Sequence, residues 1–371
     1  MKKDRFIIES LLDGTGILIN GNNPYDPQIH DERFYNRVLR DGSLGLGESY
    51  MDNWWDCQNI DQFIHKILNA NLDQKIIKNW DVVLGIIRSL FLNAGRQSKA
   101  FEIGRRHYDL GNDLYKAMLD KRLTYTGGYW KDAQNLDQAQ EAKLDLVCRK
   151  IELKSGQKLG DFGSGYASLT GYAAEKYNVN AIGFTVSKEQ KMLADILYKD
   201  LAVQTRLRDY RNIREKFDHI VSLGMFEHVG YKNYSTFMKV VHNSLKDDGL
   251  FLLHTIGSNH SVKETDKWTQ KYIFPNSMLP SIAQIGKAIE GLFVVEDWHN
   301  FGADYDKTLM AWYQNFENNW DSIKSNYDQR FYRMWRYYLL SCAGSFRARK
   351  NQLWQIVLSK KGIPGGYQSK R

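Results

Sequence analysis

The chain has 371 residues, which predicts two or three domains rather than one. Apolar residues make up 43% of it and only 5 residues are prolines, so a largely disordered chain is excluded. No apolar run approaches the roughly 18 residues of a membrane-spanning helix, and no signal-peptide pattern follows the first residues. Cys57, Cys148 and Cys342 stand too far apart for a CxxC metal site or a disulfide framework, which predicts a reduced, intracellular protein.

The net charge of +8 is unevenly distributed along the chain. Residues 1–100 hold 12 Lys and Arg against 13 Asp and Glu, a balance of −1, which leaves +9 for the remaining residues. A basic excess of this size favours an anionic partner, either nucleic acid or a phospholipid surface.

The first part of the chain is expected to form a small, mainly helical domain over residues 1–92. Turn-forming residues separate its first segments, and apolar spacing predicts helices at 59–70 and 74–92. A polar stretch then predicts a linker at 93–106, so that residues 107–371 form the second domain.

From about residue 137 the pattern alternates between helix and strand. Apolar runs that begin at Lys158, Asn180, Phe217 and Gly249 are expected to be strands, and helices are expected at 137–152, 169–177 and 188–200. This order predicts an α/β fold with a doubly wound, parallel sheet. Residues 258–300 interrupt the alternation and are expected to form a lid or insertion, and the tail at 318–358 reads as helical and aromatic.

A glycine turn follows the first of these strands. Asp161, Gly163 and Gly165 form an Asp-x-Gly-x-Gly motif, which lets a ligand approach the backbone at the carboxyl ends of the strands. Ser168 stands where a dinucleotide fingerprint has its third glycine, and Thr185 and the two residues after it offer no acidic side chain for a ribose. Both features count against NAD, whereas a methyltransferase and a simple tight turn both fit.

Long strings elsewhere in the chain resemble the cyclopropane-fatty-acyl-phospholipid synthases, which are relatives of the mycolic acid cyclopropane synthases. The strings are GSLGLGESYMD at 42–52, HYDLGND at 107–113, GMFEHVG at 224–230, LLHTIG at 252–257, YIFPN at 272–276, DWHNFG at 297–302 and AWY at 311–313. The resemblance covers essentially the whole chain. It implies the class I S-adenosylmethionine-dependent methyltransferase fold, with a small helical N-terminal domain and a lipid-binding insertion.

The resemblance also implies a reaction. Such enzymes transfer a methyl group from S-adenosylmethionine to the cis double bond of a phospholipid acyl chain. Loss of a proton from the new methyl group then closes a cyclopropane ring, with a bound bicarbonate ion as the base. By motif match, Glu227, His254 and Tyr313 line the bicarbonate site and the N–H of Ile256 is a further donor. Cys342 matches a cysteine treated as a candidate active-site residue, although methyl transfer requires no thiol.

The same matching implies a cofactor site along the carboxyl edge of the sheet. Its residues are Tyr125 and Thr126 near the methionine end, Asp161, Gly163, Ser164 and Gly165 in the glycine turn, Thr185 and Gln190 near the ribose, Tyr210 and Arg211 near the adenine, and Gly224 after the next strand. Glu227, His228 and His254 have no spacing that supports a metal ion, so no metal is expected.

Three positions depart from the family pattern. Gly127 replaces a cysteine of the bicarbonate site, Gly160 lies in a strand that it is expected to weaken by about 0.5–1 kcal/mol, and Ala167 adds a methyl group near the cofactor. Two alternatives to the synthase therefore stay open. One is a decayed protein that binds lipid or cofactor without catalysis, and the other is an alkene methyltransferase that does not close the ring.

A stripe of basic and aromatic residues in the tail is a candidate surface for contact with a bilayer. It comprises Arg330, Arg333, Arg336, Arg347, Arg349 and Lys350, interleaved with Phe331, Tyr332, Trp335, Tyr337, Tyr338 and Phe346. Such a stripe suits an anionic membrane, but it also suits nucleic acid or an aromatic core bordered by arginines. With the resemblance, we expect a cytoplasmic protein at the inner face of the membrane, acting on unsaturated phospholipids without nucleic acid. A homodimer stays open.

Overall fold

A computed structural model describes residues 2–70 and 111–371 of the chain. Their contacts divide into two compact units. Unit 1 comprises Met1–Met118, Glu264–Asn276 and Trp312–Lys350, and unit 2 comprises Leu119–Lys263, Ser277–Ala311 and Asn351–Arg371. The division predicted at 93–106 lies outside the described residues. The expectation that 107–371 forms one domain needs correction, because three of its segments belong to unit 1: its start as far as Met118, Glu264–Asn276 and Trp312–Lys350.

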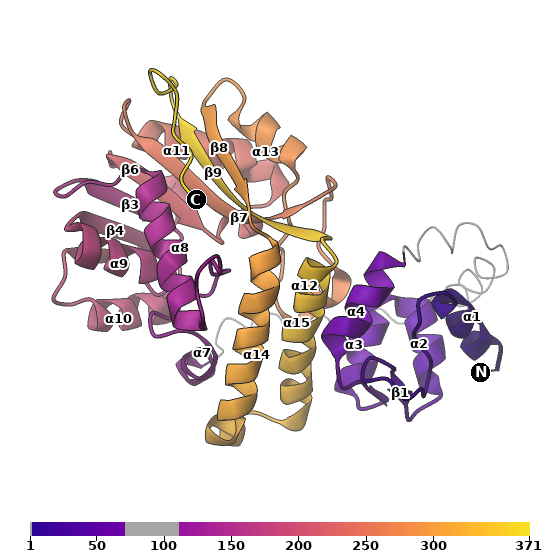
Figure 1. Ribbon diagram of the computed structural model, residues 1–371. Coiled ribbons are helices and arrows are strands. Elements are labelled where there is room, and N and C mark those ends of the chain that lie inside the picture. Colours follow the sequence, from indigo (N-terminus) through magenta and orange to yellow (C-terminus); the bar gives the residue numbers. More distant parts are fainter. Residues whose placement is uncertain (1, 71–110) are drawn as a thin grey trace. The chain divides into compact units, whose positions relative to one another are not determined.

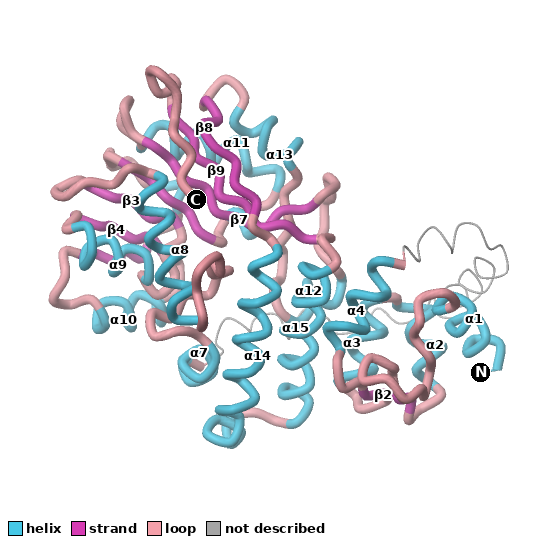
Figure 2. The backbone as a smooth tube through the Cα atoms, viewed as in Figure 1, coloured by secondary structure: helices cyan, strands magenta, loops and turns pink. Residues whose placement is uncertain are grey.

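Unit 1 is mainly helical (Figure 2). Its elements are α1 (Lys2–Leu12), α2 (Arg33–Asp41), α3 (Ser43–Met51), α4 (Ile60–Asn69), α7 (Asn112–Met118), α12 (Lys267–Tyr272), η5 (Lys324–Asn326) and α15 (Gln329–Arg347), with β1 (Gln28–Ile29) paired to β2 (Trp55–Asp56). The predicted helix at 59–70 corresponds to α4, and the one at 74–92 lies outside the described residues.

Helix α15 packs on α3 and α4 through an aromatic core. The ring of Trp55 contacts Tyr50 and Tyr337 at centroid distances of 5.2 and 6.5 Å. Gly344 allows the close approach of α15 to α4, because a Cβ there would lie 2.4 Å from the carbonyl oxygen of Asp61. The aromatic residues of the tail therefore complete the core of unit 1.

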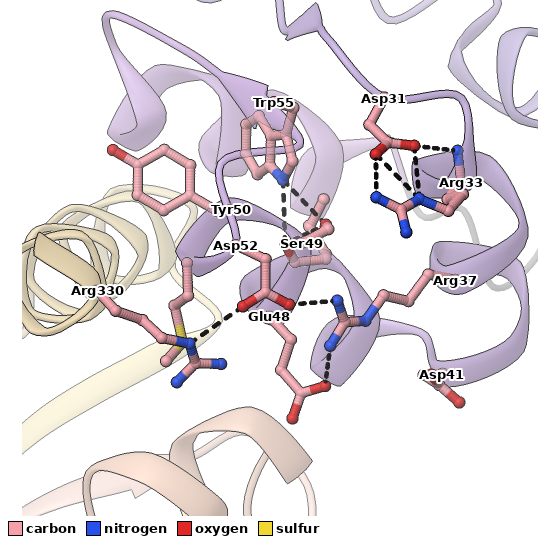
Figure 3. A network of polar contacts seen from close by, with 12 residues as sticks. Asp31, Arg33, Arg37, Asp41, Glu48, Ser49, Tyr50, Asp52, Trp55 and Arg330 are labelled. Carbon is pink, nitrogen blue, oxygen red and sulfur yellow. Dashed lines mark hydrogen bonds and ion pairs between the residues drawn. The ribbon is translucent and has the colours of Figure 1, made fainter.

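Several arginines of the tail form hydrogen bonds and ion pairs within unit 1. Arg333 is buried, donates to the carbonyl oxygens of Tyr50 and Trp55 and pairs with Asp56 at 2.8 Å. Two other arginines bind acidic residues of the same unit: Arg330 bonds Asp52 at 3.0 Å (Figure 3), and Arg347 bonds Asp61 at 2.5 Å. Of the alternatives left open for the stripe, an aromatic core bordered by arginines is the arrangement found for these residues.

Unit 2 contains a seven-stranded sheet in the order β5-β4-β3-β6-β7-β9-β8 (Figure 1). The strands are β3 (Lys158–Phe162), β4 (Asn180–Thr185), β5 (Val203–Leu207), β6 (His219–Leu223), β7 (Leu250–Ser258), β8 (Val294–Asn300) and β9 (Asn351–Ser359). All pairs from β5 to β7 are parallel, and β9 runs antiparallel between β7 and β8. The predicted doubly wound sheet is confirmed, and it gains an antiparallel strand.

Two strands occur where the sequence suggested other structure. Strand β9 lies in the tail that was expected to be helical, and β8 lies in the segment expected to be an insertion. The run from Gln352 to Ser359 is buried throughout, and a buried strand of this kind lacks the alternation that distinguishes a strand from a helix.

Helices cover both faces of the sheet (Figure 1). The flanking elements are α8 (Leu136–Lys150), α9 (Ser168–Tyr177), α10 (Lys188–Leu197), η2 (Tyr210–Asn212), η3 (Phe226–His228), η4 (Tyr231–Asn233), α11 (Tyr234–Ser244) and α13 (Ile282–Ile289), and α14 (Ala303–Ile323) continues into unit 1. One buried cluster joins α8 and α9 to the sheet, and another joins α11 and α13 to it. The sheet is thus packed between two helical layers.

Gly160 is a packing requirement of this sheet rather than a defect. The aromatic ring of Phe217 fills the space beside it, so that a Cβ at residue 160 would lie 2.9 Å from that ring. Phe217 is fully buried, and its ring contacts Phe162 and Phe184 edge-on. The expected entropic weakening is therefore accompanied by the burial of a complete phenyl ring.

Candidate active site

The glycine turn after β3 has the backbone that its sequence requires. Gly163 and Gly165 have φ angles of +93° and +53°, which favour glycine. The N–H groups of Gly163 and Ser164 both donate to the carbonyl oxygen of Phe184, which ties the turn to β4. A Cβ at Gly165 would meet no atom within 4 Å, so this part of the turn borders open space.

Two side chains beside this turn each present a buried polar atom without a partner in the described part of the chain. Asp161 Oδ1 and Ser164 Oγ are buried, and neither has a hydrogen-bond partner among the described residues. Burial raises the pKa of Asp161 to about 7, although the positive charge of Lys143 opposes the shift. Buried polar atoms without partners are costly, and they fit a site whose ligand supplies the missing hydrogen bonds.

The Tyr125–Thr126 segment is held by two residues of α8 that the sequence analysis did not single out. Lys143, which is fully buried, donates to Thr126 Oγ1 at 2.7 Å, and Gln140 donates to the carbonyl oxygen of Thr126 at 2.7 Å. Burial lowers the pKa of Lys143 to about 7. Gly224, with φ +70°, lies against the same threonine, because its Cβ would be 2.7 Å from Thr126 Cγ2. The sequence signal that could have identified Lys143 was a lysine on the apolar face of an amphipathic helix.

The ribose and adenine candidates lie at the ends of β4 and β5. Thr185 Oγ1 donates to Gln190 Oε1 at 2.7 Å, which links the strand to α10. Tyr210 is half-buried, and its ring contacts Phe237 edge-on at 5.3 Å. Arg211 is exposed, and its guanidinium binds Asp209 at 2.9 and 2.7 Å. The guanidinium is therefore engaged by a neighbouring carboxylate.

Ala167 takes a backbone conformation that suits glycine. Its φ of +65° lies in the left-handed region, which costs a non-glycine residue roughly 1–2 kcal/mol. Its side chain packs with Ala194 and Tyr198. The extra methyl group thus joins a small apolar cluster.

Glu227 and His254 form a second group of buried polar side chains, at η3 after β6 and at the middle of β7. Glu227 Oε1 accepts the N–H of Ile256 at 2.7 Å, and Oε2 has no partner among the described residues. The N–H expected to bind an anion is thus engaged by this carboxyl group. Burial raises the pKa of Glu227 to about 7, although the Ile256 N–H opposes the shift.

The ring of His254 is also fully enclosed. Its Nδ1 lies 3.4 Å from Gln355 Nε2, and its Nε2 has no partner within the described ranges. Burial keeps the pKa of His254 well below its ordinary value, so the ring is neutral at physiological pH. Gln355 was not predicted, and a glutamine in the apolar run LWQIVL was the signal that could have identified it.

The remaining candidate residues are Gly127, Tyr313 and Cys342. Gly127 belongs to unit 2, where a Cβ would approach Leu353 Cδ2 to 2.7 Å. Tyr313 belongs to unit 1, where Arg336 Nε donates to its hydroxyl at 3.4 Å. Cys342 also belongs to unit 1, and burial raises the pKa of its thiol to about 12, so the thiol stays protonated at neutral pH.

Residues 2–70 and 111–371 contain no group of three His, Cys, Asp or Glu side chains that could hold a metal ion. None of the helices described in these ranges is both long and apolar enough to cross a membrane.

Comparisons with known proteins agree with this architecture. The sequence profile of the family described as mycolic acid cyclopropane synthetase matches residues 95–356. The chain belongs to this family. The cyclopropane-fatty-acyl-phospholipid synthase of Escherichia coli K12 is 49% identical over 365 residues, which cover 98% of this chain and 95% of that protein.

Solved structures of the family share the fold. The cyclopropane synthase MmaA2 from Mycobacterium tuberculosis matches with a TM-score of 0.65 and 27% identity over 72% of this chain and all of that one. The mycolic acid cyclopropane synthase CmaA1, solved with SAH and CTAB, matches with a TM-score of 0.65 and 30% identity over 71% of this chain and 99% of that one. The chain is a class I S-adenosylmethionine-dependent methyltransferase.

Proposed function

We propose that this enzyme converts the cis double bond of an unsaturated acyl chain in a membrane phospholipid into a cyclopropane ring, with S-adenosylmethionine as the donor. The observation that carries the proposal is the buried group formed by Glu227 and His254. Each presents one polar atom that lacks a partner in the described structure, as expected of a site that holds a small polar reactant in apolar surroundings. The 49% identity to a synthase of this activity supports the same conclusion.

The residues around the glycine turn fit the donor. When bound, S-adenosylmethionine supplies the methyl group as part of a sulfonium ion. Asp161 and Ser164 offer the unpartnered polar atoms, and Gly165 leaves room for the ligand beside the backbone. Tyr210 offers an aromatic ring for the adenine. Lys143 and Gln140 would act indirectly, by fixing the segment that contains Tyr125 and Thr126.

The second half of the reaction needs a base in an apolar site. We infer that bicarbonate is this base and that Glu227 and His254 hold it. A carboxylate would repel the anion, but a pKa of about 7 leaves much of Glu227 protonated at neutral pH, so its unpartnered oxygen can donate. A neutral histidine can donate through its protonated ring nitrogen. Tyr313 and the position of Gly127 stay candidates for the same site by motif match.

Association with the membrane surface and a cytoplasmic location belong to the same proposal. A phospholipid substrate requires contact with a bilayer, and the basic balance after residue 100 favours an anionic one. Because α15 uses several of its arginines internally, the basic residues that meet the lipid would have to lie elsewhere.

The test is incubation of the full chain with S-adenosylmethionine and vesicles of unsaturated phospholipid, followed by mass analysis of the acyl chains. A gain of one CH2 without a remaining double bond supports the proposal. A gain of CH2 with a double bond or hydroxyl group would indicate methylation without ring closure. Cofactor binding without any gain would indicate a decayed enzyme. Glu227→Gln should bind S-adenosylmethionine normally in calorimetry and form fewer rings.

A further inference from the structure

A row of polar residues crosses the antiparallel part of the sheet beside the site. In the strand register, Gln355 of β9 lies opposite His254 of β7 on one side and His299 of β8 on the other. Residues directly opposite each other in neighbouring strands project to the same face of a sheet. Gln355 is therefore placed by the fold between two histidines, inside the apolar run from Leu353 to Leu358.

Gln355 makes a specific contact with one of these rings. Its Nε2 lies 3.4 Å from His254 Nδ1, and both side chains are essentially inaccessible to solvent. His299 Nδ1, in contrast, has no hydrogen-bond partner among the residues that the structure describes, and its ring contacts Tyr129 and Phe301 instead. The carboxamide thus serves His254.

The orientation of the carboxamide decides which tautomer His254 adopts. An amide N–H can only donate, so it makes Nδ1 an acceptor and leaves the proton of a neutral ring on Nε2. The opposite orientation would put the NH2 group where Oε1 now has no partner. That orientation would leave both N–H groups without an acceptor, whereas the present one gives the NH2 group an acceptor at His254 Nδ1 and leaves only the oxygen atom without a partner. Buried N–H groups without a partner are rarer than under-satisfied carbonyl oxygens.

We propose that Gln355 is a positioning residue of the reaction centre, which holds His254 in the neutral Nε2–H tautomer so that Nε2 is a donor toward a bound oxyanion. This inference rests on the proposed function for the identity of the anion, but the tautomer itself is a property of the protein alone. His254 Nε2, which has no partner in the described structure, is the proposed donor to the anion. The contact from Gln355 Nε2 to His254 Nδ1 is what would keep the proton on that atom.

The first test reads the tautomer without any substrate. The full chain is labelled with 15N-histidine, and His254→Gln identifies the signals of residue 254. We expect an unprotonated Nδ1 and a protonated Nε2 in the wild type. A wild-type ring protonated on Nδ1 would overturn the proposal.

A matched control lies three residues away on the same strand. Gln352 is also buried, but its carboxamide bonds Asn259 and Asn300. Gln352→Leu should leave the His254 signals as in the wild type, whereas Gln355→Leu should mix the two tautomers. Similar spectra for the two leucine variants would refute a specific role for Gln355.

Kinetics provide the second test. Gln355→Leu should lower kcat for ring formation about 100-fold, as expected when one anion donor is lost, with unchanged affinity for S-adenosylmethionine in calorimetry. Gln352→Leu should retain most of the rate. If the wild type forms no rings, the proposed function fails, but the wild-type spectrum still shows whether His254 has the tautomer that the role of Gln355 requires. If the wild type is active and Gln355→Leu equals it, the positioning role fails alone.

Discussion

Glu227→Gln should change how the stability of the protein depends on pH. Burial raises the pKa of Glu227 from 4.5 to about 7 in the folded chain. The folded state therefore binds this proton more tightly than the unfolded state, and the wild type loses stability as pH rises from about 4.5 to 7. A shift of this size corresponds to about 3 kcal/mol. The glutamine has no such proton. The free energy of unfolding of the variant, relative to that of the wild type, should therefore rise by about 3 kcal/mol between pH 5 and pH 8.

The measurement is urea unfolding of both full-length proteins without cofactor across this pH range. Glu48→Gln is the matched control, because Glu48 is buried but binds Arg37 at 2.6 Å (Figure 3) and also Lys271 and Tyr272. Although burial opposes it, these bonds lower the pKa of Glu48, so its variant should lose about 1–3 kcal/mol at neutral pH and approach the wild type only in acid. Parallel stability curves for Glu227→Gln and the wild type between pH 5 and pH 8 would refute the reasoning.

Three further outcomes follow from the packing and the charge. Gly160→Ala should lower the free energy of unfolding by about 1–3 kcal/mol, because its Cβ meets the ring of Phe217; unchanged urea unfolding would contradict this packing. Gly127→Cys meets no left-handed backbone but must displace Leu353; it should therefore fold with reduced stability, and initial rates at varied bicarbonate will tell whether the thiol adds to anion binding. Sedimentation with anionic vesicles should weaken at 1 M salt, where the Debye length falls to about 3 Å, and equal binding at low and high salt would indicate hydrophobic insertion.

The sequence allowed the central part of unit 2 to be predicted because local patterns specify it. The alternation of helices and apolar runs from α8 to β7 is readable within short windows, and the glycines after β3 mark a turn whose positive φ angles only glycine adopts easily. Glu227 and His254 were found through resemblance, since no spacing relates a residue in η3 to one in β7.

Other features depend on partners far away in the chain. The proposed role of Gln355 depends on its contact with His254, which is about a hundred residues earlier. Arg333 likewise binds a backbone carbonyl group near residue 50. No periodicity reports such pairs, so the arginine stripe suggested a membrane surface and the glutamine was overlooked. The strand β9 was read as part of a helical tail for a related reason, because burial on both faces removes its alternation.

The interleaving of the two units has a consequence for synthesis on the ribosome. Residues near the N-terminus complete their aromatic core only when α15 is available, and the sheet of unit 2 joins β7 to β8 only through β9, at 351–359. Neither unit can therefore finish folding before almost the whole chain has emerged. The nascent chain must expose apolar surfaces of both units for most of its translation, which predicts a strong dependence on chaperones and poor recovery of fragments truncated before residue 360.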